Sequence, residues 1–293
     1  MRAESIFLNA NGLRFGALSW GAGPLVLAFH GFPDTAHTWS ELGPRLAARR
    51  FRVVAPFMRG YAPTEAPRRD ATSRDLGLDV LGIANTLGET VVHLVGSDWG
   101  AEAVHAAVGL EPTRFTTLTT VGIPHRAAVK PSPGLAWALR HFVMLQLPGA
   151  EARFAADDFA QLEHLSRRWS PTWQPSANDL EAMKASFRQP GTVHAALGYY
   201  RASSVLVPEF MKKKVAVPTL CVAGRDDPSV SPAQYEPTRR HFTGHFEVLT
   251  IKGGHFCHRE DPDVFAAALL RHFGAAPVDA NVSGAARGFR VVD

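Results

Sequence analysis

Six short, mostly apolar runs constrain the fold of this chain more than any other feature of its sequence. Helix-like stretches separate the runs, which lie at residues 25–29, 52–55, 91–95, 117–121, 219–223 and 246–251. Strands that are apolar on both faces and alternate with helices form parallel sheets covered by helices on both sides. The chain is therefore predicted to have an α/β fold.

The N-terminal segment follows a different pattern. Residues 5–20 alternate apolar and polar side chains on both sides of Asn11-Gly12, a dipeptide that favours two-residue hairpin turns. An antiparallel hairpin is therefore expected at the start of the fold. At the other end, a helix at 263–273 is expected to close the sheet.

The alternation stops between about residues 123 and 214. Prolines separate aromatic, helix-like stretches at 136–147, 158–169 and 178–187, and no strand pattern occurs. We expect a helical cap, residues 125–212, inserted into a core of residues 1–124 and 213–275. Residues 276–293 contain Gly, Ala and Asn and are expected to form an irregular tail.

Composition excludes several classes of protein. Hydrophobic residues make up 46% of the 293 residues and charged residues 20%, which is enough to build a large core. The net charge is +4, but Lys and Arg are scattered, and the run Lys212-Lys213-Lys214 is typical of a solvated helix end. We therefore expect no nucleic-acid partner.

Cysteines and the N-terminus bear on location. The chain has only two cysteines, Cys221 and Cys257, and neither belongs to a CxxC or Cys-His motif. Neither a disulfide framework nor a zinc site is therefore indicated. The first residues lack a signal-peptide pattern, and no apolar run is long enough to cross a bilayer. A cytoplasmic protein with no membrane partner is expected.

The strongest chemical signal is Gly96-Ser97-Asp98-Trp99-Gly100, which joins a predicted strand to a predicted helix. Glycine on both sides permits a sharp turn that exposes the central side chain at the sheet edge, as in a nucleophile elbow. Serine is the usual residue at that tip, and here it is Asp98. The structural alternative is that Asp98 caps the following helix.

An acid and a histidine follow in the order expected for a catalytic triad. The strand at 219–223 leads into Asp226-Asp227-Pro228, and the last strand leads into Gly253-Gly254-His255. We favour Asp226 as the acid that orients His255 because it comes first after the strand. Asp227 is the alternative, and is expected to begin the turn before Pro228.

A fourth strand end contributes the upstream segment His30-Gly31-Phe32-Pro33. In this position the backbone N–H of Phe32 can join that of Trp99 in an oxyanion hole. Phe32, Pro33 and Trp99 are also expected to line the substrate pocket.

A carboxylate nucleophile restricts the bond that is attacked. Serine attacking a saturated carbon would leave an ether, whereas Asp98 leaves an ester that water can hydrolyse with His255 as general base. The expected substrates are electrophiles with a leaving group on an sp³ carbon, such as epoxides or organohalides.

These motifs resemble the epoxide hydrolase branch of the α/β-hydrolases, which is related to the haloalkane and haloacetate dehalogenases. The resemblance covers nearly the whole chain apart from the tail. It extends to Arg59-Gly60-Tyr61 and to the cap residues 146–151. It implies a mostly parallel eight-stranded sheet with flanking helices and an inserted helical cap. The sequence contains no metal cluster, phosphate-binding loop or dinucleotide-binding motif, so we expect no cofactor.

The resemblance also implies proton donors in the cap. Tyr200, in Gly198-Tyr199-Tyr200-Arg201, matches the second cap tyrosine of epoxide hydrolases, and His141 stands where the first is usual. Tyr199 is expected to contact substrate. The alternatives are aromatic packing for the tyrosines and a helix-face position for His141.

Three functions therefore remain, with epoxide opening favoured. A haloalkane or haloacid dehalogenase is less well matched, because Phe32 stands where a second halide donor is usual and Trp99 and Glu102 would not bind a carboxylate. A non-catalytic protein that binds a small apolar ligand has no need of the ordered triad. The sequence leaves open the substrate, the stereochemistry and whether the chain forms a homodimer.

Overall fold

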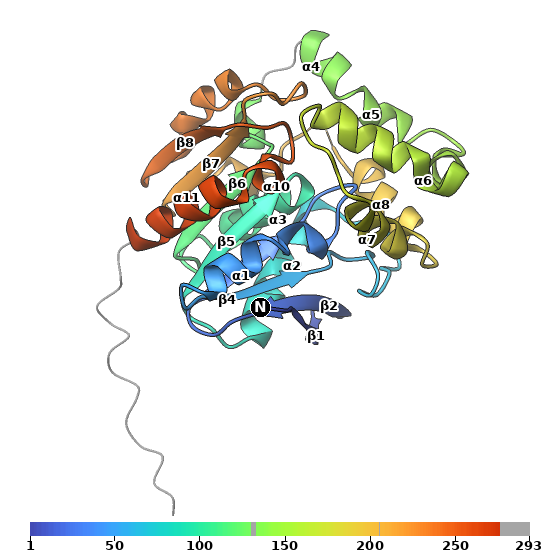
Figure 1. Cartoon of the computed structure of the whole chain (residues 1–293). Coiled ribbons are helices and arrows are strands. Elements are labelled where there is room, and N and C mark those ends of the chain that lie inside the picture. Colours follow the sequence, from blue (N-terminus) through green and yellow to red (C-terminus); the bar gives the residue numbers. More distant parts are fainter. Residues whose placement is uncertain (130–132, 205, 276–293) are drawn as a thin grey trace, which may run out of the picture.

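The computed structural model describes residues 1–129, 133–204 and 206–275. Eight strands form one sheet in the order β1-β2-β4-β3-β5-β6-β7-β8 (Figure 1). The strands are β1 (Glu4–Ala10), β2 (Leu13–Trp20), β3 (Leu25–Phe29), β4 (Arg52–Pro56), β5 (Val92–Ser97), β6 (Thr117–Val121), β7 (Thr219–Gly224) and β8 (Phe246–Ile251). Pairing is antiparallel for β1–β2 and β2–β4 and parallel elsewhere. The predicted mostly parallel eight-stranded sheet is confirmed.

The hairpin at the N-terminus forms as predicted. Asn11 and Gly12 both have positive φ, 44° and 76°, as a two-residue turn of this kind requires. The turn sets a register in which Ala10 pairs with Leu13 and Glu4 with Ser19.

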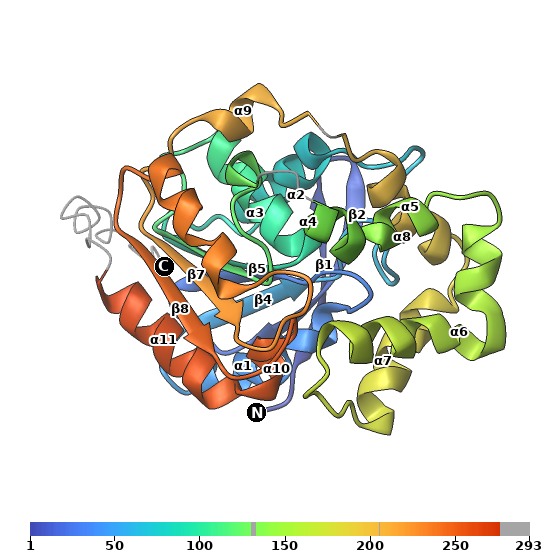
Figure 2. The ribbon, with the colours of Figure 1, turned by 90° about the horizontal axis from the view of Figure 1, so that it is seen from above.

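Helices cover both faces of the sheet. Figure 2 shows α2 and α3 on one face and α1, α10 and α11 on the other. The core helices are α1 (Leu42–Ala47), α2 (Ser73–Thr86), α3 (Trp99–Leu110), α9 (Glu209–Lys212), α10 (Cys257–Glu260) and α11 (Pro262–Ala275), with 3₁₀ turns η1 (Ala36–Trp39), η2 (Arg126–Ala128), η3 (Pro232–Gln234) and η4 (Glu236–His241).

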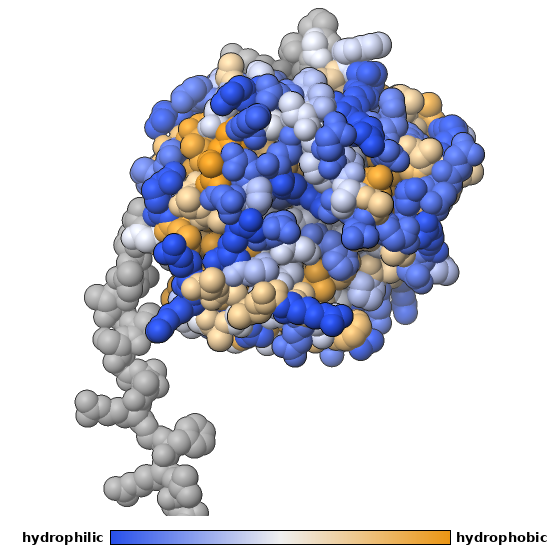
Figure 3. Space-filling model, in the orientation of Figure 1, coloured by the Kyte–Doolittle hydropathy of each residue, from blue (hydrophilic) through white to orange (hydrophobic). Residues whose placement is uncertain are grey.

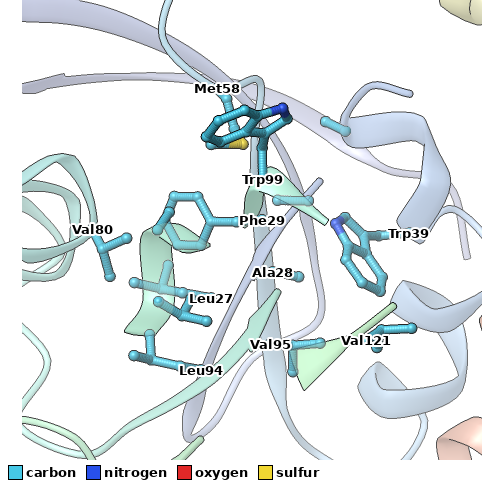
Figure 4. Packing of buried hydrophobic residues seen from close by; sticks show 14 of the residues in the cluster. Leu27, Ala28, Phe29, Trp39, Met58, Val80, Leu94, Val95, Trp99 and Val121 are labelled. Carbon is cyan, nitrogen blue, oxygen red and sulfur yellow. The ribbon is translucent and has the colours of Figure 1, made fainter. Parts of the chain in front are cut away.

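Apolar side chains alternate between the two faces. Figure 4 shows Leu27 and Leu94 on the side of Val80 from α2, whereas Val95 lies on the side of Trp39. All five are fully buried. Burial on both faces explains why these strands read as continuous apolar runs in the sequence.

Five of the helices between β6 and β7 form a separate layer at one edge of the core (Figure 1). They are α4 (Pro133–Ala138), α5 (Arg140–Met144), α6 (Ala150–Trp169), α7 (Ala177–Phe187) and α8 (Thr192–Arg201). At the two ends of the predicted cap, 125–212, η2 packs on η4 and α9 packs on α3. These two end pieces therefore contact the core. The predicted tail, 276–293, lies outside the described residues.

Two cap helices differ from the sequence prediction. The helix expected at 136–147 is split at Leu139, whose φ and ψ are −89° and 12°. The helix expected at 158–169 begins earlier, as α6, and is kinked where Asp157, Asp158 and Phe159 have positive φ. The Asp158 carboxylate at this kink pairs at 2.8 Å with Arg188, the residue that caps the C-terminus of α7.

The surface is mainly polar. Figure 3 shows a largely hydrophilic face on which hydrophobic residues form small, separated groups. Lys212, Lys213 and Lys214 are exposed, as the sequence predicted. Within the described ranges, no helix has both the length and the apolar content needed to cross a membrane.

Candidate active site

Asp98 occupies the tip of a strained turn between β5 and α3. Its φ is 52° and its ψ is −118°, a conformation that costs energy in a residue other than glycine. A Cβ at Gly96 would lie 2.3 Å from the carbonyl oxygen of Gly100, and a Cβ at Gly100 would lie 2.1 Å from that of Phe29. Both glycines are therefore required for the turn. The Asp98 side chain makes no capping bond to α3, so the helix-cap alternative fails.

The loop after β3 supplies a hydrogen-bond donor to this carboxylate. The backbone N–H of Phe32 donates to Oδ1 of Asp98 at 2.8 Å. Gly31 permits the approach, because a Cβ there would lie 2.3 Å from Cβ of Asp98. Phe32 is thus placed as predicted, next to buried Pro33. The second donor, the N–H of Trp99, stays a prediction.

His30 holds the same loop in place, a role that the sequence did not reveal. Its Nε2 accepts the N–H of Met58 at 2.9 Å, so its Nδ1 carries the proton and donates to the carbonyl of Gly31 at 2.9 Å. Burial lowers the pKa of His30 to about 4. The neutral ring is therefore part of the scaffold at pH 7.

His255, the predicted catalytic histidine, pairs with Asp227, which corrects the choice of Asp226. Nδ1 of His255 lies 2.8 Å from Oδ2 of Asp227, and Nε2 lies 3.6 Å from Oδ2 of Asp98. Asp227 and His255 are buried, whereas Asp226 is exposed. The acid that orients His255 is Asp227.

The Asp227 carboxylate both orients His255 and begins the turn before Pro228, whereas the sequence analysis assigned the first of these roles to Asp226. Oδ1 of Asp227 accepts the N–H groups of Ser229 and Val230, at 2.7 and 3.2 Å, and so begins the turn at Pro228. This turn leaves Oδ2 directed at His255. The turn before Pro228 was the reason for preferring Asp226, but this turn fixes the orientation of the Asp227 carboxylate. An anchored carboxylate holds an imidazole better than a mobile one.

The surroundings of His255 favour its charged form. Burial alone lowers the pKa of His255, but the charge and hydrogen bond of Asp227, together with the charge of Asp98, outweigh burial and raise the pKa to about 10. The resting site therefore holds an imidazolium between two carboxylates.

The cap places Tyr200 of α8 above the elbow. Its ring meets those of Phe32, Trp99 and Phe142 edge-on, with centroids 5.3, 5.2 and 4.8 Å away. Burial raises the pKa of Tyr200 well above its usual value, and the charge of Asp98 raises it further. Tyr200 is thus a neutral hydroxyl near Asp98, and its role as a proton donor stays a prediction.

His141 of α5 lies beside Tyr200, with ring centroids 5.9 Å apart. Burial lowers the pKa of His141 to about 4, so the ring is neutral at pH 7. Among the described residues its Nδ1 has no hydrogen-bond partner. The structure brings this predicted donor into the site, and its role stays a prediction.

Tyr199, unlike Tyr200, uses its hydroxyl in a hydrogen bond to the core backbone. Its hydroxyl donates to the carbonyl oxygen of Arg59 at 2.8 Å, and its ring packs edge-on against Trp99 at 5.5 Å. Tyr199 therefore joins the cap to the core, and its hydroxyl is not free for the substrate contact predicted for it.

The described part of the chain contains no group of three His, Cys, Asp or Glu side chains suited to a metal ion. Cys221 and Cys257 are buried and unpaired. That the protein needs no cofactor stays a prediction.

Comparison with known proteins agrees with this geometry. Residues 24–262 match the family model for the alpha/beta hydrolase fold. Epoxide hydrolase 3 of Siraitia grosvenorii is 30% identical over 258 residues, which cover 76% of this chain and 81% of that protein. The chain belongs to the epoxide hydrolase branch of the α/β-hydrolase family.

Other members of this branch are similar over comparable lengths. Epoxide hydrolase 4 of Mus musculus is 28% identical over 88% of this chain and 75% of its own length. The crystal structure of an epoxide hydrolase from Vigna radiata superimposes with a TM-score of 0.80 at 26% identity, covering 93% of this chain and 98% of that one.

Proposed function

We propose that this enzyme opens epoxides to vicinal diols through an ester on Asp98. The observation that carries the proposal is the position of Asp98, with Oδ1 at the N–H of Phe32 and Oδ2 near the His255–Asp227 pair. Relatives named epoxide hydrolases support the substrate class.

In the first step, Oδ2 of Asp98 attacks an epoxide carbon and the C–O bond on that carbon breaks. Oδ1 stays at the N–H of Phe32 and becomes the carbonyl oxygen of the ester. The expelled alkoxide takes a proton from Tyr200, the neutral hydroxyl above the elbow. A positioned acid is needed because an alkoxide is a poor leaving group at neutral pH.

Ester formation prepares His255 for the second step. The negative charge of Asp98 helps to raise the pKa of His255, and that charge disappears when the ester forms. The pKa of His255 then falls, so the ring loses its proton to solvent and becomes a base.

In the second step, His255 removes a proton from water, which attacks the ester carbonyl. The N–H of Phe32 stabilises the resulting oxyanion on Oδ1. Collapse breaks the bond between Cγ and Oδ2 of Asp98, so Oδ2 leaves as a diol oxygen and takes the proton from His255, and the oxygen of water replaces it in the carboxyl group. Asp98 is left as a carboxylic acid and its proton restores Tyr200. His255 then regains from solvent the proton that it lost when the ester formed.

The test stops the reaction at the ester. His255→Gln removes the base, and mass spectrometry of the peptide containing Asp98 is performed after incubation with styrene oxide or 1-bromohexane. A gain equal to the mass of styrene oxide supports the proposal, and Asp98→Asn in the same background must abolish it.

Other outcomes would assign a different function. A hexyl adduct with bromide release, and none from styrene oxide, would transfer the assignment to the dehalogenases. No adduct from either compound would favour a binding protein that shares the fold.

A further inference from the structure

The loop that carries His255 has three successive backbone N–H groups with assigned acceptors. Gly254 donates to Oε1 of Glu260 at 2.6 Å, His255 to the carbonyl of Trp169 at 2.9 Å, and Phe256 to Oγ of Ser170 at 2.7 Å. Buried N–H groups need such partners, so these bonds fix the path of the loop.

Two of the three acceptors belong to the cap. Trp169 is the last residue of α6 and Ser170 is its C-cap, and Figure 2 shows α6 reaching across toward α10, which follows the catalytic loop. The third acceptor, Glu260, also receives the hydroxyl of Thr172, at 2.6 Å. The hydrogen bonds from the cap to this loop and to Glu260 therefore come from one short segment, residues 169–172, and the ring of Trp173 adds a contact with that of Phe256 at 5.2 Å.

The fit between the two segments is close. A Cβ at Gly254 would lie 2.5 Å from Cα of Ser170 and 2.6 Å from the carbonyl oxygen of Trp169. Ser170 and Trp169 are buried, at 0% and 3% exposure. No side chain fits at position 254 while these hydrogen bonds remain.

We infer that Ser170 is a positioning residue for His255: its hydroxyl, by holding the N–H of Phe256, keeps the imidazole in place for ester hydrolysis. The inference rests on the function proposed above. Ser170 does not touch the reacting atoms, and it acts through the adjacent backbone.

The two half-reactions should depend on Ser170 to different degrees. Asp98 is positioned by its own turn and by the N–H of Phe32, and the Ser170 hydroxyl is hydrogen-bonded to Phe256 instead of to either of them. His255 transfers a proton only in the second half-reaction, and small displacements of a catalytic group reduce rates severely. Loss of the Ser170 hydroxyl should therefore slow hydrolysis of the ester and spare its formation.

The experiment compares Ser170→Ala with Ser166→Ala by rapid-quench kinetics with styrene oxide. Ser166 lies one turn earlier in α6, is equally buried, and donates to the carbonyl of Leu162 in its own helix. In Ser170→Ala we expect ester hydrolysis to slow by about tenfold or more and ester formation to change by less than about threefold. The ester on Asp98 then accumulates in Ser170→Ala and not in Ser166→Ala.

Gly254→Ala provides a second route to the same result. The added methyl separates the loop from the cap while the Ser170 hydroxyl remains, so the same accumulation of ester is expected. Equal slowing of both half-reactions in Ser170→Ala and Gly254→Ala, or Ser170→Ala kinetics like those of Ser166→Ala, would overturn the positioning role and leave the epoxide mechanism standing. Absence of any ester in His255→Gln as well would instead overturn the mechanism.

Discussion

Asp227 and His255 form a buried pair in which Oδ2 lies 2.8 Å from Nδ1. The side chain of Asp227 is 1% exposed and that of His255 is 6% exposed. Because both are shielded from water, the bond fixes the tautomer of His255 and presents its Nε2 to the Asp98 side of the site.

Asp227→Asn should therefore disable the enzyme. The amide can leave the imidazole in the wrong tautomer and cannot stabilise its charge, so turnover of styrene oxide should fall on the order of a hundredfold or more. Asp226→Asn is the matched control, one residue away and exposed, and should keep turnover within about twofold. A larger loss in Asp226→Asn than in Asp227→Asn would reverse the assignment.

Removal of the Asp98 charge should lower the pKa of His255. That pKa is raised to about 10, and the charge of Asp98 contributes to the rise. In Asp98→Asn, which mimics the uncharged ester, the ring should lose its proton at a lower pH. NMR titration of the His255 ring nitrogens measures this, and an unchanged titration would mean that ester formation does not activate the base.

Tyr200→Phe should impair ring opening because it removes the proton donor. The rate of ester formation from styrene oxide should fall by about tenfold to a thousandfold, while hydrolysis of ester already formed should change little. Rapid-quench measurement separates the two rates.

Tyr199→Phe is the control for that experiment. It removes the bond to the carbonyl of Arg59, so it should lower the free energy of unfolding by about 1 kcal/mol and leave ester formation within a few-fold. If both variants lose ring opening equally, Tyr200 has no special role as a donor.

His30 should make the fold sensitive to acid. Its pKa is lowered to about 4 by burial, against about 6.5 in an unfolded chain. Between these values the unfolded chain binds a proton that the folded chain does not, so the free energy of unfolding falls as pH drops from about 6.5 to about 4. In His30→Gln, unfolding at pH 5 should take up about one proton fewer, as measured by calorimetry in buffers of different ionisation enthalpy.

The buried ion pair between Arg59 and Asp79 should contribute more to the free energy of unfolding than an exposed ion pair does. Asp79 accepts two bonds from Arg59, at 2.6 and 2.5 Å, and both side chains are below 10% exposure. Asp79→Asn leaves a buried guanidinium unpaired and should cost about 3 kcal/mol in chemical denaturation. Asp263→Asn, which breaks the exposed pair with Arg45, should cost less than about 1 kcal/mol.

Local patterns predicted the sheet well because each strand is defined by its own residues. The strands expected at 25–29, 117–121 and 246–251 have the observed limits, and the hairpin follows from Asn11 and Gly12. The turn that carries Asp98 could also be predicted from the sequence, because its geometry requires the neighbouring residues Gly96 and Gly100.

Features that depend on contacts between residues far apart in the chain could not be predicted from local sequence patterns. The kink in α6 places Asp158 against Lys184 and Arg188 of α7, which no pattern within α6 reveals. The choice between Asp226 and Asp227 depended on the direction of each carboxylate, and hence on the turn that uses Oδ1 of Asp227. Two of the three acceptors for the His255 loop, Trp169 and Ser170, likewise come from a segment 86 residues away in the chain.

The attachments of α8 also bear on which substrates fit. Tyr199, Arg201 and Thr192 bind this helix to core backbone and core carboxylate atoms at 2.8–3.3 Å, whereas His141 and Phe142 of the short helix α5 meet the site through ring contacts. The proposed substrate site thus has one wall, from α8, that hydrogen bonds hold in place and one, from α5, that fewer bonds restrain. Acceptance of bulkier epoxides should therefore be gained by changing the α5 wall, because enlargement from the α8 side would loosen the attachment of the cap itself.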